Sequence, residues 1–150
     1  MTAADPNGEG VTKTPVHLWI VGILALVWNA IGAFDYLATQ FELEFYMGSF
    51  EPEMLEYFYG IPSWAIAGWA IAVWFAFAGS IGLLLRKCWS VWAFGISIVG
   101  MVVSSIHSYL LSNGLEIMGA GGLVFSIFIW IIAFGLFFYA RAMCKKGVLS

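Results

Sequence analysis

The stretch WAIAGWAIAVWFAFAGSIGLLLRKCW, residues 64–89, decides the fold of this chain. Between Trp64 and Leu85 the only polar side chains are Ser80 and three tryptophan indoles. A run of about 20 apolar residues is long enough to cross ~30 Å of hydrocarbon as a helix. Arg86 and Lys87 end the run, and a second apolar run begins at Trp89. The chain therefore crosses a membrane, turns at once and crosses back.

The same pattern extends over most of the chain. We predict four spans, at about residues 18–38, 64–85, 89–111 and 118–140. The 150 residues are 62% hydrophobic and only 10% charged, whereas soluble domains carry about 25% charged residues. Within lipid every backbone polar group must be satisfied internally, which favours helices. We therefore expect an all-α membrane protein. A four-helix transmembrane bundle (16–141) lies between a disordered tail (1–15) and a short tail (142–150), both cytoplasmic.

The basic residues orient this bundle. The connections 39–61 and 112–117 contain no Lys or Arg. Because basic residues in short loops stay cytoplasmic, both termini are predicted to face the cytosol. Cys88 and Cys144 fall on the same side, where thiols are normally reduced, so we expect no disulfide. The six Lys and Arg residues are Lys13, Arg86, Lys87, Arg141, Lys145 and Lys146.

The connection 39–61 forms the long outer loop and carries five Glu residues. Within it, Glu51-Pro52-Glu53 predicts a helix start, since proline and carboxylates both suit the first turn. Met54, Leu55, Tyr57 and Phe58 would give this helix an apolar face. We expect a short interfacial helix on the outer membrane surface.

Small residues mark the faces through which helices pack in lipid. The second span offers Gly68, Ala72, Ala76 and Gly79 at helical spacing. The other three spans each carry a comparable stripe, which is typical of one compact bundle. Close packing alone demands this pattern, so it does not by itself indicate a pore.

Asp35 and His107 are the ionisable side chains near membrane depth on the outer half. Each lies ~26 Å from the inner edge, counted at 1.5 Å per residue. A carboxylate beside an imidazole could gate a cavity or relay a proton. The alternative is that both sit among lipid headgroups, where charge costs little.

Other side chains could form a polar path or interhelical contacts. Asn29 lies ~9 Å deeper than Asp35, and Ser126 reaches a similar level on the fourth span. A buried Asn more often joins helices than binds a ligand. Ser104, like Ser97, Ser105 and Ser108, can bond to its own helix backbone and needs no further role.

Three tryptophans fall near mid-depth, away from the aromatic belts at the membrane surfaces. Trp28, Trp74 and Trp130 could line a cavity and stack on a ring-shaped solute. They could equally serve as large packing or lipid-facing groups.

We expect no enzyme activity, catalytic residue, metal site or cofactor. No P-loop, GxSxG or HExxH motif occurs. His17 lies at the inner edge and His107 at the outer, so one haem cannot be held between them. The basic residues form membrane-edge clusters rather than a broad stripe, which excludes nucleic acid as an expected partner.

Several segments carry a resemblance to known proteins. They are His17-Leu18-Trp19, Trp28-Asn29, Phe34-Asp35-Tyr36, Tyr57-Phe58-Tyr59-Gly60, Pro62-Ser63-Trp64 and Ala140-Arg141-Ala142-Met143. Across residues 16–150 the chain resembles small uncharacterised bacterial four-span membrane proteins, sometimes labelled sugar transporters. The resemblance implies a bacterial inner membrane and a transporter role, and it brings no binding residues with it.

Two functions follow as hypotheses. The chain is a small-solute, sugar-like transporter or permease component, acting as a homo-oligomer. Alternatively it is a non-catalytic accessory or assembly subunit of a larger membrane complex, docked through the acidic loop 42–56. A polar cavity open to the outer side would favour transport, and a sealed, dry core would favour the accessory role.

Overall fold

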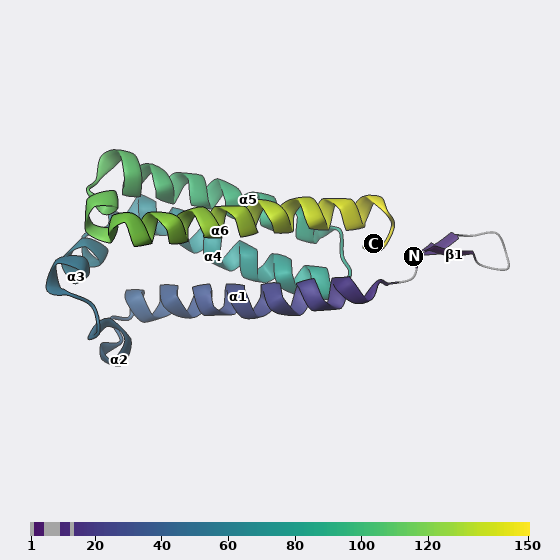
Figure 1. Cartoon of the computed structure of the whole chain (residues 1–150), viewed down its shortest axis with the longest axis horizontal. Coiled ribbons are helices and arrows are strands. Elements are labelled where there is room, and N and C mark those ends of the chain that lie inside the picture. Colours follow the sequence, from purple (N-terminus) through teal and green to yellow (C-terminus); the bar gives the residue numbers. More distant parts are fainter. Residues whose placement is uncertain (1, 5–9, 13) are drawn as a thin grey trace.

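The computed structural model describes residues 2–4, 10–12 and 14–150. Strands β1 (Thr2–Ala4) and β2 (Gly10–Thr12) pair antiparallel ahead of the bundle. The rest of the described chain is helical (Figure 1). The remainder of the predicted disordered tail, residues 1, 5–9 and 13, lies outside the described residues. The helices are α1 (Val16–Gln40), α2 (Glu44–Met47), α3 (Pro52–Tyr59), α4 (Ser63–Leu84), α5 (Trp89–Ser105), the π-helix η1 (Ile106–Leu111) and α6 (Gly114–Lys145).

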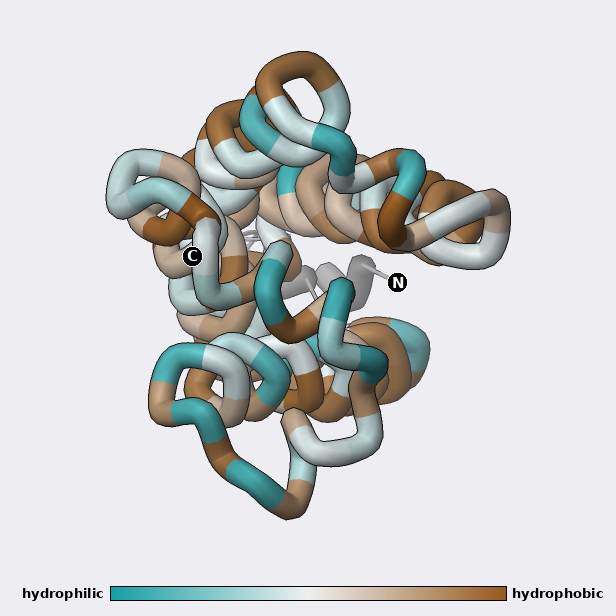
Figure 2. The backbone as a smooth tube through the Cα atoms, turned by 90° about the vertical axis from the view of Figure 1, so that its left-hand side faces the viewer, coloured by the Kyte–Doolittle hydropathy of each residue, from teal (hydrophilic) through white to brown (hydrophobic). Residues whose placement is uncertain are grey.

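Four helical segments are long and apolar enough to cross a membrane, which confirms the predicted fold class. They are α1, α4, α5 continued by η1, and α6, and they run side by side along the long axis (Figure 1). Figure 2 looks along this axis from the end that carries α2 and α3, where hydrophilic residues gather in the connections. The protein is thus a four-span integral membrane protein whose helices contact lipid.

The helix bounds differ from the predicted spans by a few residues at most ends. The largest difference is in α6, which begins at Gly114 and continues to Lys145. Gly119 interrupts it with φ 68° and ψ −168°, a conformation that glycine adopts without steric cost. The segment Gly114–Met118 therefore forms a separate helical turn at the outer end, and the span proper follows the break.

The closest helix contact joins α4 to α5 through glycine. A Cβ atom added at Gly100 would lie 2.6 Å from the Ala72 nitrogen and 2.6 Å from the Gly68 oxygen. One added at Gly68 would lie 2.8 Å from Val103. The predicted small-residue stripe of the second span thus faces α5. With no side chain between them, the two backbones gain dispersion contacts along their length.

The connection between α1 and α4 contains a short helix where one was predicted: α3, with Pro52 in its first turn. It also contains α2, a single turn that the sequence analysis did not predict. Tyr57 on α3 hydrogen-bonds Ser112 in the α5–α6 connection, with 3.0 Å between the hydroxyl oxygens. The loop is therefore attached to the bundle end.

At the opposite end, the expectation of two free thiols is wrong. Cys88 and Cys144 form a disulfide, with 5.4 Å between their Cα atoms. The two are 56 residues apart in sequence, and only the antiparallel packing of α5 and α6 brings them to the same level. Val148 and Leu149 are buried beside them. Backbone hydrogen bonds from Cys88 N to Ser150 O (2.9 Å) and from Ser150 N to Arg86 O (2.8 Å) fasten the C-terminal residues to the α4–α5 turn.

The glycine contact yields a stability prediction. We expect Gly100→Ala to destabilise the protein by about 1–3 kcal/mol, because the added methyl group meets backbone atoms that cannot move independently. Thermal unfolding in detergent, followed by circular dichroism, measures the effect. Gly135→Ala is the matched control, since a Cβ there meets nothing within 4 Å. Equal melting temperatures for the two variants would show that α4 and α5 are not in backbone contact.

Candidate functional site

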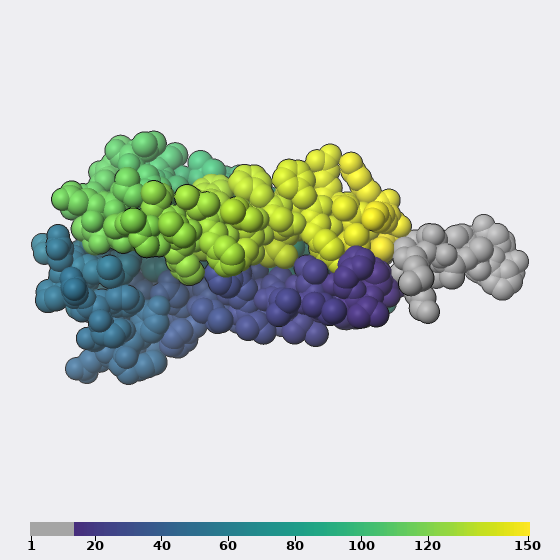
Figure 3. All heavy atoms as spheres, viewed as in Figure 1, coloured from purple at the N-terminus to yellow at the C-terminus, as the bar shows by residue number. Residues whose placement is uncertain are grey.

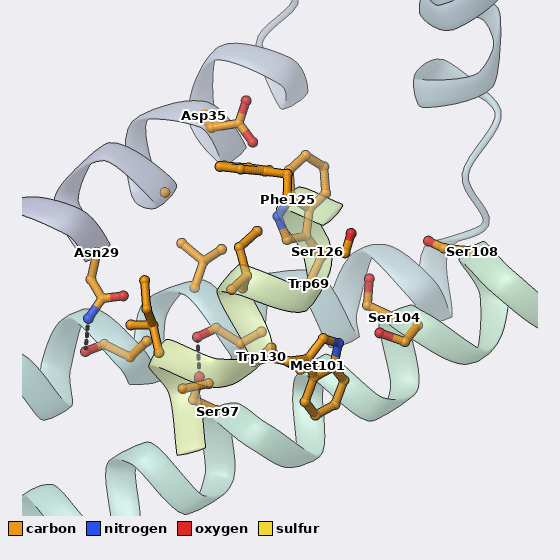
Figure 4. Close-up of a pocket in the computed structure, with 18 of the residues that line it drawn as sticks. Asn29, Asp35, Trp69, Ser97, Met101, Ser104, Ser108, Phe125, Ser126 and Trp130 are labelled. Carbon is orange, nitrogen blue, oxygen red and sulfur yellow. Dashed lines mark hydrogen bonds between the residues drawn. The ribbon is translucent and has the colours of Figure 1, made fainter. Parts of the chain in front are cut away.

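A cavity of about 450 Å³ lies between the four spans and extends from the end that carries α2 and α3 past the middle of the bundle (Figure 4). It is lined by α1, α4, α5, η1 and α6, and by loop residues that include Tyr46 and Tyr57. Phe94 and Leu136, which are buried, line its far end. Ile31 and Phe125, which are 61% and 57% exposed, also line it. The cavity therefore extends to the seam between α1 and α6, which lie side by side in the space-filling view (Figure 3).

Asn29 combines the two roles considered for it. Its amide nitrogen donates to the Ser80 hydroxyl (2.7 Å) and to the Ala76 carbonyl (3.2 Å), which joins α1 to α4. Its amide oxygen makes no hydrogen bond within the described chain and is directed toward the cavity (Figure 4). Asn29 thus joins α1 to α4 through its amide N–H group and presents its free amide oxygen to the cavity.

The serines of the third span also divide into two kinds. Ser97 donates to the Ala72 carbonyl on α4 at 2.6 Å and so joins helices rather than bonding to its own backbone. The hydroxyls of Ser104, Ser105 and Ser108 line the cavity without a hydrogen-bond partner in the described part of the chain. Three unpaired hydroxyls on one wall can each donate and accept a hydrogen bond.

Asp35 is half-buried and lines the cavity from α1. Its carboxyl group accepts a hydrogen bond from the Tyr46 hydroxyl on α2, which ties the outer loop to the first span. Burial, together with this hydrogen bond and the Asp35 charge, raises the pKa of the Tyr46 phenol to about 12. Asp35 is the one carboxyl side chain among the described lining residues, and no Lys or Arg accompanies it there.

Aromatic rings complete the walls. Trp28 contacts Phe125 and Phe128 on α6, with ring centroids 6.1 and 5.7 Å apart, and so bridges α1 and α6. Trp69 and Trp130 also line the cavity (Figure 4). None of the three indole N–H groups donates a hydrogen bond to the described residues. The cavity therefore offers flat apolar faces together with free donors.

Two of the eight predicted site residues do not line the cavity. His107 packs between Trp64 and Tyr57, at ring-centroid distances of 5.7 and 6.2 Å, and does not line the cavity. Trp74 packs against Tyr36 and Phe77 and is 38% exposed. Asp35 meets Tyr46 instead of an imidazole, so the structure does not bring the proposed acid–imidazole pair together. The six predicted residues that line the cavity are Trp28, Asn29, Asp35, Ser104, Ser126 and Trp130.

Sequence reasoning missed several lining residues, chiefly Tyr46, Trp69 and Tyr109. Trp69 stands one turn inside the outer edge of its span, where it was indistinguishable from a belt residue. Tyr109 lies near the end of its span, where a tyrosine is expected in the aromatic belt, yet its hydroxyl donates to Ser126 on α6. Tyr46 lies in the connection between α1 and α3. The apolar pattern of the sequence does not reveal that this connection folds back onto the bundle.

The lining side chains of this site can bind a solute through hydrogen bonds and ring contacts. Within the described ranges, no three His, Cys, Asp or Glu side chains are grouped to hold a metal ion. The polar groups are instead spread around the walls, as in sites that orient a solute by hydrogen bonds. Comparisons with protein-family models, with curated proteins and with solved structures found no match to this chain.

The Tyr46 contact makes a pH-dependent prediction. The phenol pKa is about 12 in the folded protein against 10.0 ordinarily. The folded state thus keeps a proton that the unfolded state loses, and this stabilisation is present below pH 10.0 and disappears as the pH rises through about 12. Tyr46→Phe should therefore lower the melting temperature most at or below pH 10.0, with the gap to wild type shrinking toward pH 12.

The control for this measurement is Tyr59→Phe, which removes a hydroxyl from an exposed tyrosine on α3. It should leave the melting temperature unchanged over the same range. A constant gap for Tyr46→Phe from pH 8 to pH 12 would contradict the raised pKa of the Tyr46 phenol.

Proposed function

We propose that this protein binds a small, neutral, polyhydroxylated solute in the cavity between its spans and carries it across the membrane, as a transporter or permease component. The observation that carries the proposal is the polar lining: the Asn29 oxygen and the Ser104 and Ser108 hydroxyls, which are unpaired within the described residues, and the Asp35 carboxyl group, which accepts from Tyr46. Polar groups at this depth cost free energy unless a partner satisfies them. A hydroxyl-rich solute would supply those partners.

The aromatic walls favour the same class of solute. The rings of a sugar carry apolar C–H faces between their hydroxyl groups, and an indole face can cover them. Trp69 and Trp130 stand on α4 and α6, and the serine hydroxyls stand on α5 and η1. A bound ring could therefore stack on one wall and hydrogen-bond to the other.

The size and position of the cavity are also suitable. A volume of about 450 Å³ falls within the ~300–1,000 Å³ of small-molecule sites. The outer-loop residues Tyr46 and Tyr57 line it, so movement of α2 and α3 would open it toward the outer end. The walls are mostly apolar but carry several polar groups, which favours a transporter over an accessory subunit with a dry core.

The membrane, the orientation and the oligomeric state of the protein are part of the same proposal. The resemblance to bacterial four-span proteins and the cationic ends of the spans support a bacterial inner membrane with both termini in the cytoplasm. The short C-terminal tail and the α4–α5 turn would then lie on the cytoplasmic side. A homo-oligomer would let neighbouring protomers support the loosely covered α6.

Substitutions in the cavity test the solute class. With D-glucose as the probe, Asp35→Asn should weaken binding about ten- to a hundredfold, since hydrogen bonds to charged groups contribute ~1.5–3 kcal/mol. Ser104→Ala should weaken it about fivefold, as expected for a neutral hydrogen bond. Quenching of tryptophan fluorescence measures binding, and uptake of labelled glucose into liposomes containing the protein measures transport.

Glu53→Gln is the control, because Glu53 is exposed on α3 and does not line the cavity. It should bind and transport like wild type. Uptake no faster than in protein-free liposomes, together with stable co-purification of another membrane protein, would instead favour the accessory role.

The orientation is tested by labelling with a membrane-impermeant maleimide in intact spheroplasts. The background variant carries serine at Cys88 and Cys144. In it, Glu53→Cys should react, whereas Lys87→Cys should react only after the membrane is permeabilised. Both positions are exposed, so access to the reagent depends on sidedness. The opposite pattern would reverse the proposed topology.

A further inference from the structure

A second, separate groove lies between α5 and α6 at the other end of the bundle. Its volume is about 660 Å³. Its apolar walls include Trp92, Ile96 and Val99 from α5 and Phe137 from α6. Gly95 forms its floor, since a Cβ there would lie 3.4 Å from the Phe137 ring. Trp92 and Val99 are 76% and 62% exposed, so the groove is open on the lipid side.

Two cations stand where this groove meets the membrane surface. Arg141 and Lys145 both line it and are one turn apart on α6, so they share a helix face. Both are exposed, and neither forms an ion pair or hydrogen bond within the described residues. The acidic side chains that the structure describes all lie toward the other end of the bundle, from Asp35 through the outer loop to Glu116. Among the described side chains, these two charges therefore have no counter-ion.

The dimensions of the groove correspond to one membrane leaflet. From Cys88 to Val99 it follows α5 for ~16 Å at 1.5 Å per residue. Half of the hydrocarbon core is ~15 Å thick. The groove is an apolar channel of this length with two cations only at the end that meets the membrane surface. This arrangement fits a phospholipid, whose acyl chain is apolar and whose headgroup is anionic. Arg in particular can contact a phosphate through two parallel N–H groups.

We propose that the α5–α6 groove is a binding site for one anionic phospholipid, with its phosphate on Arg141 and Lys145 and an acyl chain over Gly95. The site is distinct from the cavity between the spans and does not depend on the solute proposed there. The lipid would cover the exposed side of the contact between α5 and α6, beside the Cys88–Cys144 disulfide.

The test uses the full-length protein in a neutral detergent. Native mass spectrometry and thermal unfolding are recorded with added palmitoyl-oleoyl phosphatidylglycerol, with the matching phosphatidylcholine, and with inorganic phosphate. Wild type should bind phosphatidylglycerol at least tenfold more tightly than phosphatidylcholine. Phosphate alone should neither stabilise the protein nor displace the lipid at millimolar concentration.

Three single variants and one double variant test the charged and apolar parts of the site separately. Arg141→Gln and Lys145→Gln should each weaken phosphatidylglycerol binding about fivefold, and about thirtyfold together, as estimated for charges near an anionic headgroup. Gly95→Leu should weaken binding of both lipids, because it fills the acyl channel. Lys87→Gln is the matched control: it removes a cation from the same end of the bundle but outside the groove, and it should bind like wild type.

The exposed charge variants leave the packed interior untouched, and their melting temperatures without lipid verify that they fold. Equal affinity for the two lipids, or an equal loss for Lys87→Gln and the double variant, would overturn the proposal. So would a stable dimer that Gly95→Leu abolishes, since a second copy of the chain would then occupy the groove.

Discussion

The backbone contact between α4 and α5 is the constraint on which the rest of the bundle depends. Lipid provides no hydrophobic drive between helices, so association relies on close packing and on buried hydrogen bonds. Gly68 and Gly100 let the two backbones touch, and the Ser97 hydroxyl donates across the same contact at 2.6 Å. The α1 helix is then added to α4 through the Asn29–Ser80 hydrogen bond. The α6 helix lies mainly against α5 and reaches α1 through side chains such as Trp28.

This unequal packing explains why there is a cavity. Two helices in backbone contact form one side of the bundle, whereas α1 and α6 on the other side are separated by aromatic side chains. Space left between them is closed at one end by the buried Phe94 and lined at the other by the outer loop. The polar groups of the cavity follow from the same geometry. The donors of Asn29 and Ser97 are used to hold helices together, whereas Ser104 and Ser108 lie beyond that contact and keep their hydroxyls free.

The two ends of the bundle differ in charge and in chemistry. The end with α2 and α3 carries the carboxylates, with Asp35 and Tyr46 joining the loop to the first span. The other end carries the cations, the disulfide and the folded-back Val148 and Leu149. A disulfide is normally found in an oxidising compartment, whereas basic loops mark the cytoplasmic side. These two features of one end make the redox state of Cys88 and Cys144 in cells directly informative about the environment of that end.

The amino-acid sequence by itself determined the four spans, the separation of charge between the two ends, the α3 helix after Pro52 and the glycine face of α4. Each of these depends on apolar length or on spacing within one helix, which are local properties. Six of the eight residues that it singled out by their depth line the cavity, although depth along a span does not decide which way a side chain faces. Only the tertiary structure decided that Asp35 meets Tyr46 rather than His107, that Cys88 pairs with Cys144, and that α6 breaks at Gly119. Those outcomes depend on the rotation of each helix about its axis and on how the loops return to the bundle. Even where a small-residue stripe marks a contact face, as on α4, the sequence does not say which neighbouring helix will pack against it.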